Sequence, residues 1–180
     1  MTTIQIRPAT IHDAAPLSTL ATTVFSDTYG AMIPPDTLQK HLEEQLSPEA
    51  LKADLTHLSS HYLVARDACV AHDKETLIGF SKLSPSHLPS TLRSTRSIEI
   101  VKLYVANPYH GFGIGAKLMK RSLSKAKELG YESIWLCVWE KNERAIAFYR
   151  KWGFEKVGMI EILVGDVVFD DFVLEKTLVS

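Results

Sequence analysis

Residues 109–116, Tyr-His-Gly-Phe-Gly-Ile-Gly-Ala, have the spacing in this 180-residue chain that most clearly suggests chemistry. Gly111, Gly113 and Gly115 allow backbone N–H groups to converge on an anion, because no Cβ atom stands in the way. The helix expected to follow adds roughly half a positive charge at its N-terminus. These features predict a site for a phosphate or pyrophosphate; the alternative is a tight strand-to-helix turn without a ligand.

The same residues also fit a competing pattern. Gly111, Gly113 and Ala116 match the G-x-G-x-x-G/A pattern of dinucleotide-binding folds, and Glu140 follows the next expected strand, where a ribose-binding acid would lie. Only residues 141–180 remain after it, too few to complete a doubly wound sheet. A P-loop is excluded because no Gly-Lys-Ser/Thr follows the turn.

The turn is expected to join a strand to a helix within a strand–helix–strand–helix unit. Residues 97–105 are rich in Ile and Val and predict a buried strand. A helix over residues 113–129 follows, with its apolar side chains on one face and Gly130 as its natural end. Residues 133–138 predict the next strand, and Asn142 opens a second helix that Gly153 closes.

The flanking segments predict a mixed α/β chain that forms one domain over residues 1–180. Helices are expected over residues 13–29, 37–46 and 48–58, with a Pro-Pro pair at positions 34 and 35 between the first two. Strands are expected over residues 3–8, 62–66, 77–83, 154–164 and 167–178, with a loop over 85–96 and a final hairpin through Gly165-Asp166.

Composition excludes several function classes. The formal net charge of −1 gives no reason to expect nucleic acid or an anionic membrane as a partner. No apolar stretch is long enough to span a bilayer, and no signal peptide is recognisable, so a cytoplasmic protein is expected. Cys69 and Cys137 do not make a disulfide framework or a zinc site, and the seven His lack metal-ligand spacing, so no metal is expected.

Two motifs in order resemble those of the GNAT superfamily of N-acetyltransferases. The first, R/Q-x-x-G-x-G/A, is matched by residues 110–115 and preceded by Leu103-Tyr104-Val105 and Pro108; His110 departs from it in replacing Arg or Gln. The second, Asn-x-x-Ala-x-x-Phe-Tyr-x-x-x-Gly-Phe, is matched by Asn142, Ala145, Phe148, Tyr149, Gly153 and Phe154. The resemblance covers essentially the whole chain.

The resemblance implies the α/β (α+β) GNAT fold, a mixed, mostly antiparallel twisted sheet of about six to seven strands flanked by about four helices. It implies acetyl-CoA as cosubstrate, in a cleft between the fourth and fifth strands. The residues that it assigns to this cosubstrate are Leu103, Tyr104, Val105, His110, Gly111, Phe112, Gly113, Ile114, Gly115, Ala116, Asn142, Ala145 and Tyr149.

Amine acetylation needs a base, because an alkyl ammonium has a reference pKa of about 10.4. Glu99 is the candidate, since a carboxylate in an otherwise apolar strand should have a reason to be there. Family members often place a Glu on this strand and let it act through a water. The alternative is that Glu99 lies at an exposed strand end or pairs with a cation such as Lys102 or Arg96.

Tyr149 is the candidate general acid, since a phenol with a pKa of about 10 can protonate a departing CoA thiolate. The alternative is core packing beside Phe148 and Trp152. By resemblance, a backbone N–H on the strand of residues 103–105, usually near a bulge, polarises the thioester carbonyl. Cys137 is disfavoured as a nucleophile, because a buried free Cys is mostly a small hydrophobe.

The acceptor is the least determined part. Residues 134–142 and 25–29, with Gly165-Asp166 and Asp170-Asp171, look like the corresponding residues of bacterial spermidine/spermine acetyltransferases, which implies a polyamine. Acidic residues of the early helices are candidates to line a site for a polycation, with a solvated charged face as the alternative: Asp27, Asp36, Glu43, Glu44, Glu49 and Asp54.

Three function classes therefore remain. The first is an acetyl-CoA-dependent N-acetyltransferase that acts on a primary amine of a small molecule, with spermidine or spermine as the leading acceptor. The second is acetylation of a protein N-terminus or lysine, which a flat and open acceptor groove would favour. The third is a non-catalytic module that binds acetyl-CoA. A homodimer is compatible with each of them.

Overall fold

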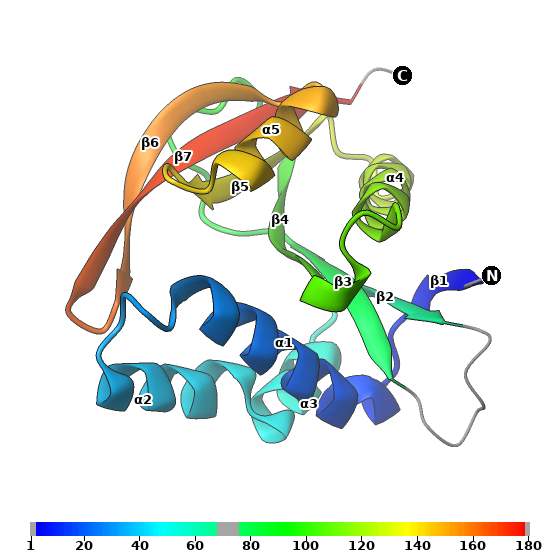
Figure 1. Ribbon diagram of the computed structural model, residues 1–180. Coiled ribbons are helices and arrows are strands. Elements are labelled where there is room, and N and C mark those ends of the chain that lie inside the picture. Colours follow the sequence, from blue (N-terminus) through cyan, green and yellow to red (C-terminus); the bar gives the residue numbers. More distant parts are fainter. Residues whose placement is uncertain (1–2, 68–75, 179–180) are drawn as a thin grey trace.

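The computed structural model describes residues 3–67 and 76–178, and these form a seven-stranded sheet in the order β1-β2-β3-β4-β5-β7-β6 (Figure 1). Every neighbouring pair is antiparallel except β4 and β5, which are parallel. The strands are β1 (Ile4–Pro8), β2 (His61–Asp67), β3 (Leu77–Ser84), β4 (Ser97–Val105), β5 (Ser133–Trp139), β6 (Glu155–Val164) and β7 (Val167–Thr177). The mixed, mostly antiparallel sheet expected from the sequence is confirmed.

Helices flank both faces of the sheet. They are α1 (Ala14–Tyr29), α2 (Pro35–Leu46), α3 (Pro48–Leu55), α4 (Ile114–Glu128) and α5 (Glu143–Lys151), with short 3-10 helices η1 (Ile11–Asp13) and η2 (Asn107–Tyr109). α2 and α3 meet at Ser47, whose Oγ accepts a hydrogen bond from the Ala50 N–H and caps α3. Pro35 begins α2 at a first-turn position where its missing N–H costs nothing.

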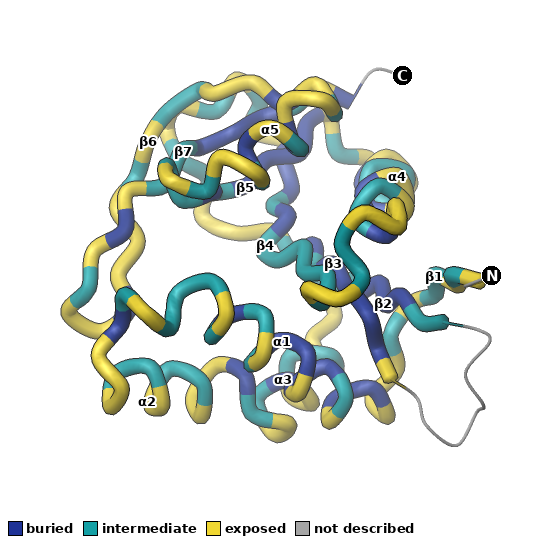
Figure 2. The backbone as a smooth tube through the Cα atoms, in the orientation of Figure 1, coloured by how far each residue is buried: buried dark blue, intermediate teal, exposed yellow. Residues whose placement is uncertain are grey.

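The two faces of the sheet have separate hydrophobic cores. Figure 2 shows where along the backbone the buried residues lie. On one face, α1, α2 and α3 bury side chains such as Leu17, Leu46 and Leu51 against Phe80 of β3. On the other, α4 and α5 bury Met119 and Ile146 with side chains of β4, β5 and β7. None of the described helices combines the length and the apolarity needed to cross a membrane. The sheet thus separates a face covered by α1–α3 from a face covered by α4 and α5.

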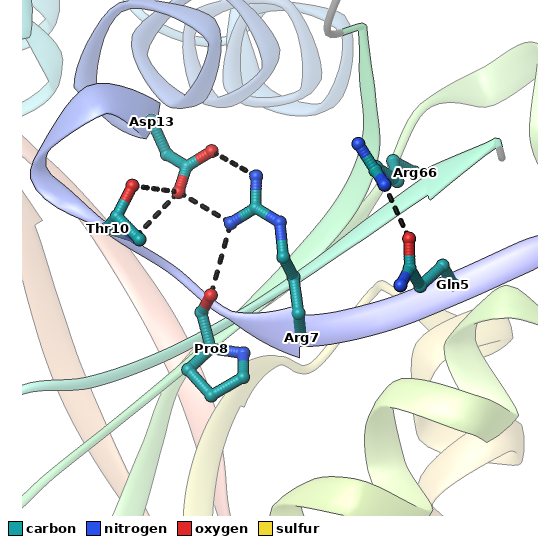
Figure 3. A network of polar contacts seen from close by, with 6 residues as sticks. All are labelled: Gln5, Arg7, Pro8, Thr10, Asp13 and Arg66. Atoms are coloured by element: carbon teal, nitrogen blue, oxygen red, sulfur yellow. Dashed lines mark hydrogen bonds and ion pairs between the residues drawn. The ribbon is translucent and has the colours of Figure 1, made fainter. Parts of the chain in front are cut away.

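A polar network fixes the start of α1 relative to β1 (Figure 3). The Arg7 guanidinium donates two hydrogen bonds to the buried carboxylate of Asp13, at 2.7 and 2.8 Å. The backbone N–H and the hydroxyl of Thr10 also donate to Asp13, at 2.6 and 3.1 Å. These bonds lower the pKa of Asp13 against the opposing effect of its burial. Two parallel hydrogen bonds fix the orientation of the Arg7 and Asp13 side chains as well as the distance between them. They therefore set the angle between β1 and α1.

Candidate active site

β4 and β5 separate part-way along their length. They pair only from Ser97 to Glu99 on β4 and from Ser133 to Trp135 on β5, although β4 continues to Val105 and β5 to Trp139. Beyond Glu99 the edge of β4 that faces β5 therefore has no strand partner among the described residues. An extended ligand with amide groups can pair with such an edge as an added strand does.

A bulge in β4 lies where this separation begins. Ile100 is aligned with Leu83 of β3 and Lys102 with Lys82, so Val101 is an extra residue on β4. A bulge re-aims the backbone and leaves the extra residue outside the ladder. The bulge that the family resemblance implies near residues 103–105 is therefore present, just before Leu103, Tyr104 and Val105.

The glycine turn has the backbone conformation that its sequence predicts. Gly111 has a φ of 87° and Gly113 a φ of 76°, which other residues adopt only with strain. A Cβ atom at either position would meet nothing within 4 Å, so the surface above both glycines is open. A Cβ atom at Gly115 would instead lie 3.6 Å from the ring of Phe148 on α5, so the start of α4 lies next to α5.

The backbone N–H groups of this turn are available to a ligand. The first hydrogen bond of α4 runs from the Lys117 N–H to the Gly113 carbonyl at 3.1 Å. Among the described residues, no acceptor is found for the N–H groups of Gly111, Phe112, Gly113, Ile114, Gly115 and Ala116. Free N–H groups at the positive end of a helix bind phosphate oxygens well.

His110 has a role that its sequence position did not reveal. The Nε2–H of its ring donates a hydrogen bond to the carbonyl oxygen of Val105, the last residue of β4, at 2.8 Å. In the sequence, His110 stood out only as a departure from the first family motif. The structure shows that its side chain ties the glycine turn back to the end of β4, five residues earlier.

α5 follows β5 and lies next to the glycine turn, on the β5 side of the separation between β4 and β5. Asn142 caps it, because its Oδ1 accepts a hydrogen bond from the Ala145 N–H at 3.1 Å, as predicted. Tyr149 is buried, with its ring 5.4 Å from that of Phe148 and 5.8 Å from that of Phe154. Both the packing and the functional interpretation of Tyr149 therefore fit its position.

The Tyr149 hydroxyl has no hydrogen-bond partner in the described part of the chain and keeps its proton. Burial raises the pKa of Tyr149, and the nearby Tyr29 raises it further. Tyr29 and Tyr149 both raise the pKa of Tyr104 of β4, in addition to the effect of its burial. These three tyrosines, from α1, β4 and α5, therefore lie near one another. Tyr149 thus carries a proton at any physiological pH close to where β4 and β5 separate.

Glu99 lies where the pairing of β4 and β5 ends, half-buried, aligned with Trp135 of β5. Burial raises the pKa of Glu99, while a hydrogen bond from Ser86 and the charges of Lys102 and Lys82 oppose that rise. Arg96 does not pair with it, because the Arg96 guanidinium binds Glu132 at 2.9 Å and the Gly130 carbonyl at 2.7 Å. A carboxyl group with a raised pKa is suited to accept a proton near neutral pH.

The face covered by α1–α3 has an aromatic wall that sequence reasoning missed, which we define as Tyr29, Trp139 and Phe169. Their ring centroids are 5.5 to 6.2 Å apart, and they come from α1, β5 and β7. Burial raises the pKa of Tyr29, and Asp171 of β7, which is aligned with Trp139, raises it further. Burial and the neighbouring Asp170 raise the pKa of Asp171 to about 6.

The acidic helices do not form a continuous lining. Asp54 is engaged by Lys82 at 2.5 Å, by Tyr62 at 2.5 Å and by Ser60 at 2.6 Å. Asp27 accepts a hydrogen bond from Asn107 at 2.7 Å. Glu43 and Glu44 interact with Gln39 and Lys40 along their own helix. Most of these carboxylates therefore have local partners, as expected of a solvated charged face.

The Cys137 thiol is not suited to act as a nucleophile. Burial raises the pKa of the Cys137 thiol to about 12, which is opposite to what a nucleophilic thiolate needs. Cys69 lies outside the described residues. Within residues 3–67 and 76–178, no three side chains of the types that bind metals are placed to hold an ion.

Comparisons with known proteins agree with this geometry. The family described as "Acetyltransferase (GNAT) family" matches residues 30–154. The chain is 27% identical to an uncharacterized N-acetyltransferase of Lactobacillus delbrueckii subsp. lactis, over 99% of this chain and 100% of that protein. It is 30% identical to an uncharacterized N-acetyltransferase of Mycobacterium tuberculosis (strain ATCC 25618 / H37Rv), over 93% of this chain and 99% of that protein.

A solved structure is similar over nearly the whole chain. It is the PaiA N-acetyltransferase from Thermoplasma acidophilum in complex with coenzyme A, with a TM-score of 0.74 and 25% identity, covering 97% of this chain and 99% of that one. The chain belongs to the acetyltransferase (GNAT) family and is an N-acetyltransferase that uses acetyl-CoA as its cosubstrate.

Proposed function

We propose that this protein transfers the acetyl group of acetyl-CoA directly to a primary amine of a small molecule, with a polyamine such as spermidine or spermine as the acceptor. The observation that carries the proposal is the set of free backbone N–H groups from Gly111 to Ala116 beside the separation of β4 and β5. Glu99 and Tyr149 flank that separation from opposite faces of the sheet.

In this proposal the pyrophosphate of acetyl-CoA accepts hydrogen bonds from the turn, from Gly111 to Ala116. The pantetheine arm then runs along the unpaired edge of β4 at Leu103, Tyr104 and Val105. Asn142 and Ala145 bound the other side of the arm from α5. His110 supports this placement, because its bond to Val105 holds the turn and the strand edge in one unit.

The chemistry follows from the groups at the separation. Glu99 accepts a proton from the acceptor ammonium, and the neutral amine attacks the thioester carbonyl. A backbone N–H next to the Val101 bulge donates to the oxygen on which negative charge develops. The C–S bond then breaks, and Tyr149 gives its proton to the departing thiolate. The products are an N-acetyl amine and CoA.

The acceptor is proposed to approach from the face covered by α1–α3. Glu99 lies on that face, and the aromatic wall and Asp171 are on it as well. Carboxylates and aromatic ring faces both attract ammonium groups. We also propose that residues 1–180 act as one acetyltransferase domain, in the cytoplasm.

The test is release of CoA thiol from acetyl-CoA over a panel of acceptors, with the acetylated product identified by mass spectrometry. The panel holds spermidine, spermine, a simple diamine, a monoamine, a peptide with a free N-terminus and a peptide with an internal lysine. Polyamines should give the highest kcat/KM. Preference for a peptide would make the protein a protein acetyltransferase, and CoA binding without transfer to any amine would make it a binding module.

A further inference from the structure

Asp171 is a half-buried carboxylate on an interior strand. β7 lies between β5 and β6, and Asp171 is aligned with Trp139 on one side and Ile160 on the other. Its carboxyl group takes part in no hydrogen bond or ion pair among the described residues. A carboxylate that is partly removed from water usually has a cation or hydrogen-bond donors beside it.

Its surroundings suit an alkylammonium group. Tyr29 and Trp139 of the aromatic wall lie next to it, and the buried Phe169 supports both rings, at 5.5 and 5.9 Å. Ring faces attract ammonium groups, most strongly when water is partly excluded. The wall and the carboxylate therefore offer an apolar surface and a negative charge together.

Glu99 and Asp171 lie on the same face of the sheet. Glu99 is aligned with Trp135 and Asp171 with Trp139, which are an even number of residues apart on β5. Between them on β5 lies Cys137, whose thiol is influenced by both carboxylates. With a rise of about 3.3 Å per residue and about 4.8 Å between strands, the two Cα atoms are on the order of 16 Å apart.

In the described part of the chain, basic groups near this face either have an acidic partner or are disfavoured by burial in their charged form. Lys82 pairs with Asp54 at 2.5 Å. Burial lowers the pKa of Lys102 on β4 and that of His41 on α2, so burial disfavours the charged form of both. Asp170 is exposed and aligned with Glu161, so it lies on the opposite face of β7 from Asp171.

We propose that Asp171, with the ring faces of Tyr29 and Trp139, binds the second ammonium group of a long diamine or polyamine while the first is acetylated beside Glu99. This inference rests on the proposed function. Allowing for the reach of both side chains, the two nitrogen atoms would be on the order of 10 Å apart, which an extended chain covers in about eight bonds.

The test is a series of α,ω-diamines with three to ten methylene groups, each compared with the monoamine of the same length. For the unmodified protein, kcat/KM should be highest near seven methylene groups, through a lower KM. In Asp171→Asn, the ratio of diamine to monoamine kcat/KM should fall about tenfold, as loss of a charge-assisted contact predicts. Asp171→Glu keeps the charge and should keep the diamine preference.

Asp170→Asn is the matched control, because it removes an adjacent carboxylate from the other face, and its diamine preference should be unchanged. The preference should also fade as the pH falls through about 6, where Asp171 takes up a proton. An equal effect of Asp170→Asn and Asp171→Asn, or no dependence on chain length, would overturn this inference while leaving amine acetylation intact. If no diamine or polyamine is acetylated, the proposed acceptor class itself is wrong.

Discussion

The proposed coenzyme side and the proposed acceptor side of this site are built in different ways. On the coenzyme side the important groups are backbone atoms: the free N–H groups from Gly111 to Ala116 and the unpaired edge of β4. On the acceptor side they are side chains from segments far apart in the sequence, such as Tyr29, Trp139 and Asp171. The coenzyme side therefore depends on backbone conformation, and the acceptor side depends on the relative positions of several side chains.

This difference determines which substitutions each side can tolerate. A backbone site depends on φ angles and strand register, so changes of side chain matter there only where they alter the backbone. A side-chain site can be re-tuned residue by residue without moving the sheet. The cosubstrate is therefore expected to be fixed by the fold, and the acceptor by a few exchangeable side chains.

Glu99→Gln, where the two halves meet, should have the largest effect. We expect kcat/KM to fall about a thousandfold, since the amine would lose its proton acceptor. Burial raises the pKa of Glu99, so the activity of the unmodified protein should fall as the pH drops through that raised value. Lys102→Met removes a positive charge near Glu99, so in this variant the fall in activity should occur at a higher pH. The control is Glu132→Gln, an exposed carboxylate paired with Arg96; an equal loss in it would contradict the assignment.

Tyr149→Phe should come next, with kcat lowered about a hundredfold, because the ring is kept and only the proton donor is lost. The affinity for CoA, measured by calorimetry, should change little. Tyr131→Phe is the matched control, since it removes a hydroxyl near the end of α4, away from the site. Parallel loss of CoA affinity and turnover in Tyr149→Phe would mean that Tyr149 supports binding rather than proton transfer.

Gly113→Ala tests the backbone half by itself. An alanine at a φ of 76° is strained by about 1 to 2 kcal/mol, so the turn should open and the KM for acetyl-CoA should rise about tenfold. Gly130 has a φ of 81° at the other end of α4, so Gly130→Ala carries a similar strain without touching the turn. Thermal melts should show similar destabilisation of both. If both variants raise the KM equally, the turn has no special role.

The smallest effect expected is on stability, in the acceptor half. The pKa of Asp171 is raised to about 6 in the folded protein, so the native state holds its proton more tightly than the unfolded chain. The free energy of unfolding should therefore fall as the pH rises from about 4 to 6. Asp171→Asn has no carboxyl group to ionise there, so at neutral pH it should be more stable than the unmodified protein by about 1 kcal/mol, after discounting for solvent exposure. Melts should show a Tm about 2 to 4 °C higher near pH 8 and no difference near pH 3.5.

The backbone half could be predicted from the sequence because its signals are local. The strand over residues 97–105 has the predicted bounds, and Asn142 caps α5 as expected. Glycine spacing reports φ angles directly, so the turn could be inferred without knowing any partner. The end of α3 differs from the prediction by three residues and the end of β5 by one, because turn and helix hydrogen bonds compete at the ends of elements.

The side-chain half could not be predicted in the same way. Nothing in the sequence indicates that Tyr29 contacts Phe169, since that contact depends on where the last residue of α1 lies relative to β7. The acidic residues of α2 and α3 suggested a polycation site, yet Asp54 is engaged by Lys82, whose position depends on the sheet register. The role of the His110 ring was missed for the same reason: its partner is a backbone carbonyl.

The central claim is that the turn from Gly111 to Ala116 binds the pyrophosphate of acetyl-CoA. Titration of 15N-labelled protein with CoA, followed by amide NMR, tests it most directly. The amide signals of Gly111, Gly113 and Ala116 should shift on saturation, and that of Gly130 should not. Acetylated pantetheine, which lacks the pyrophosphate, should shift Leu103 and Val105 but not the turn. If CoA binds and the turn signals stay in place, the claim is wrong.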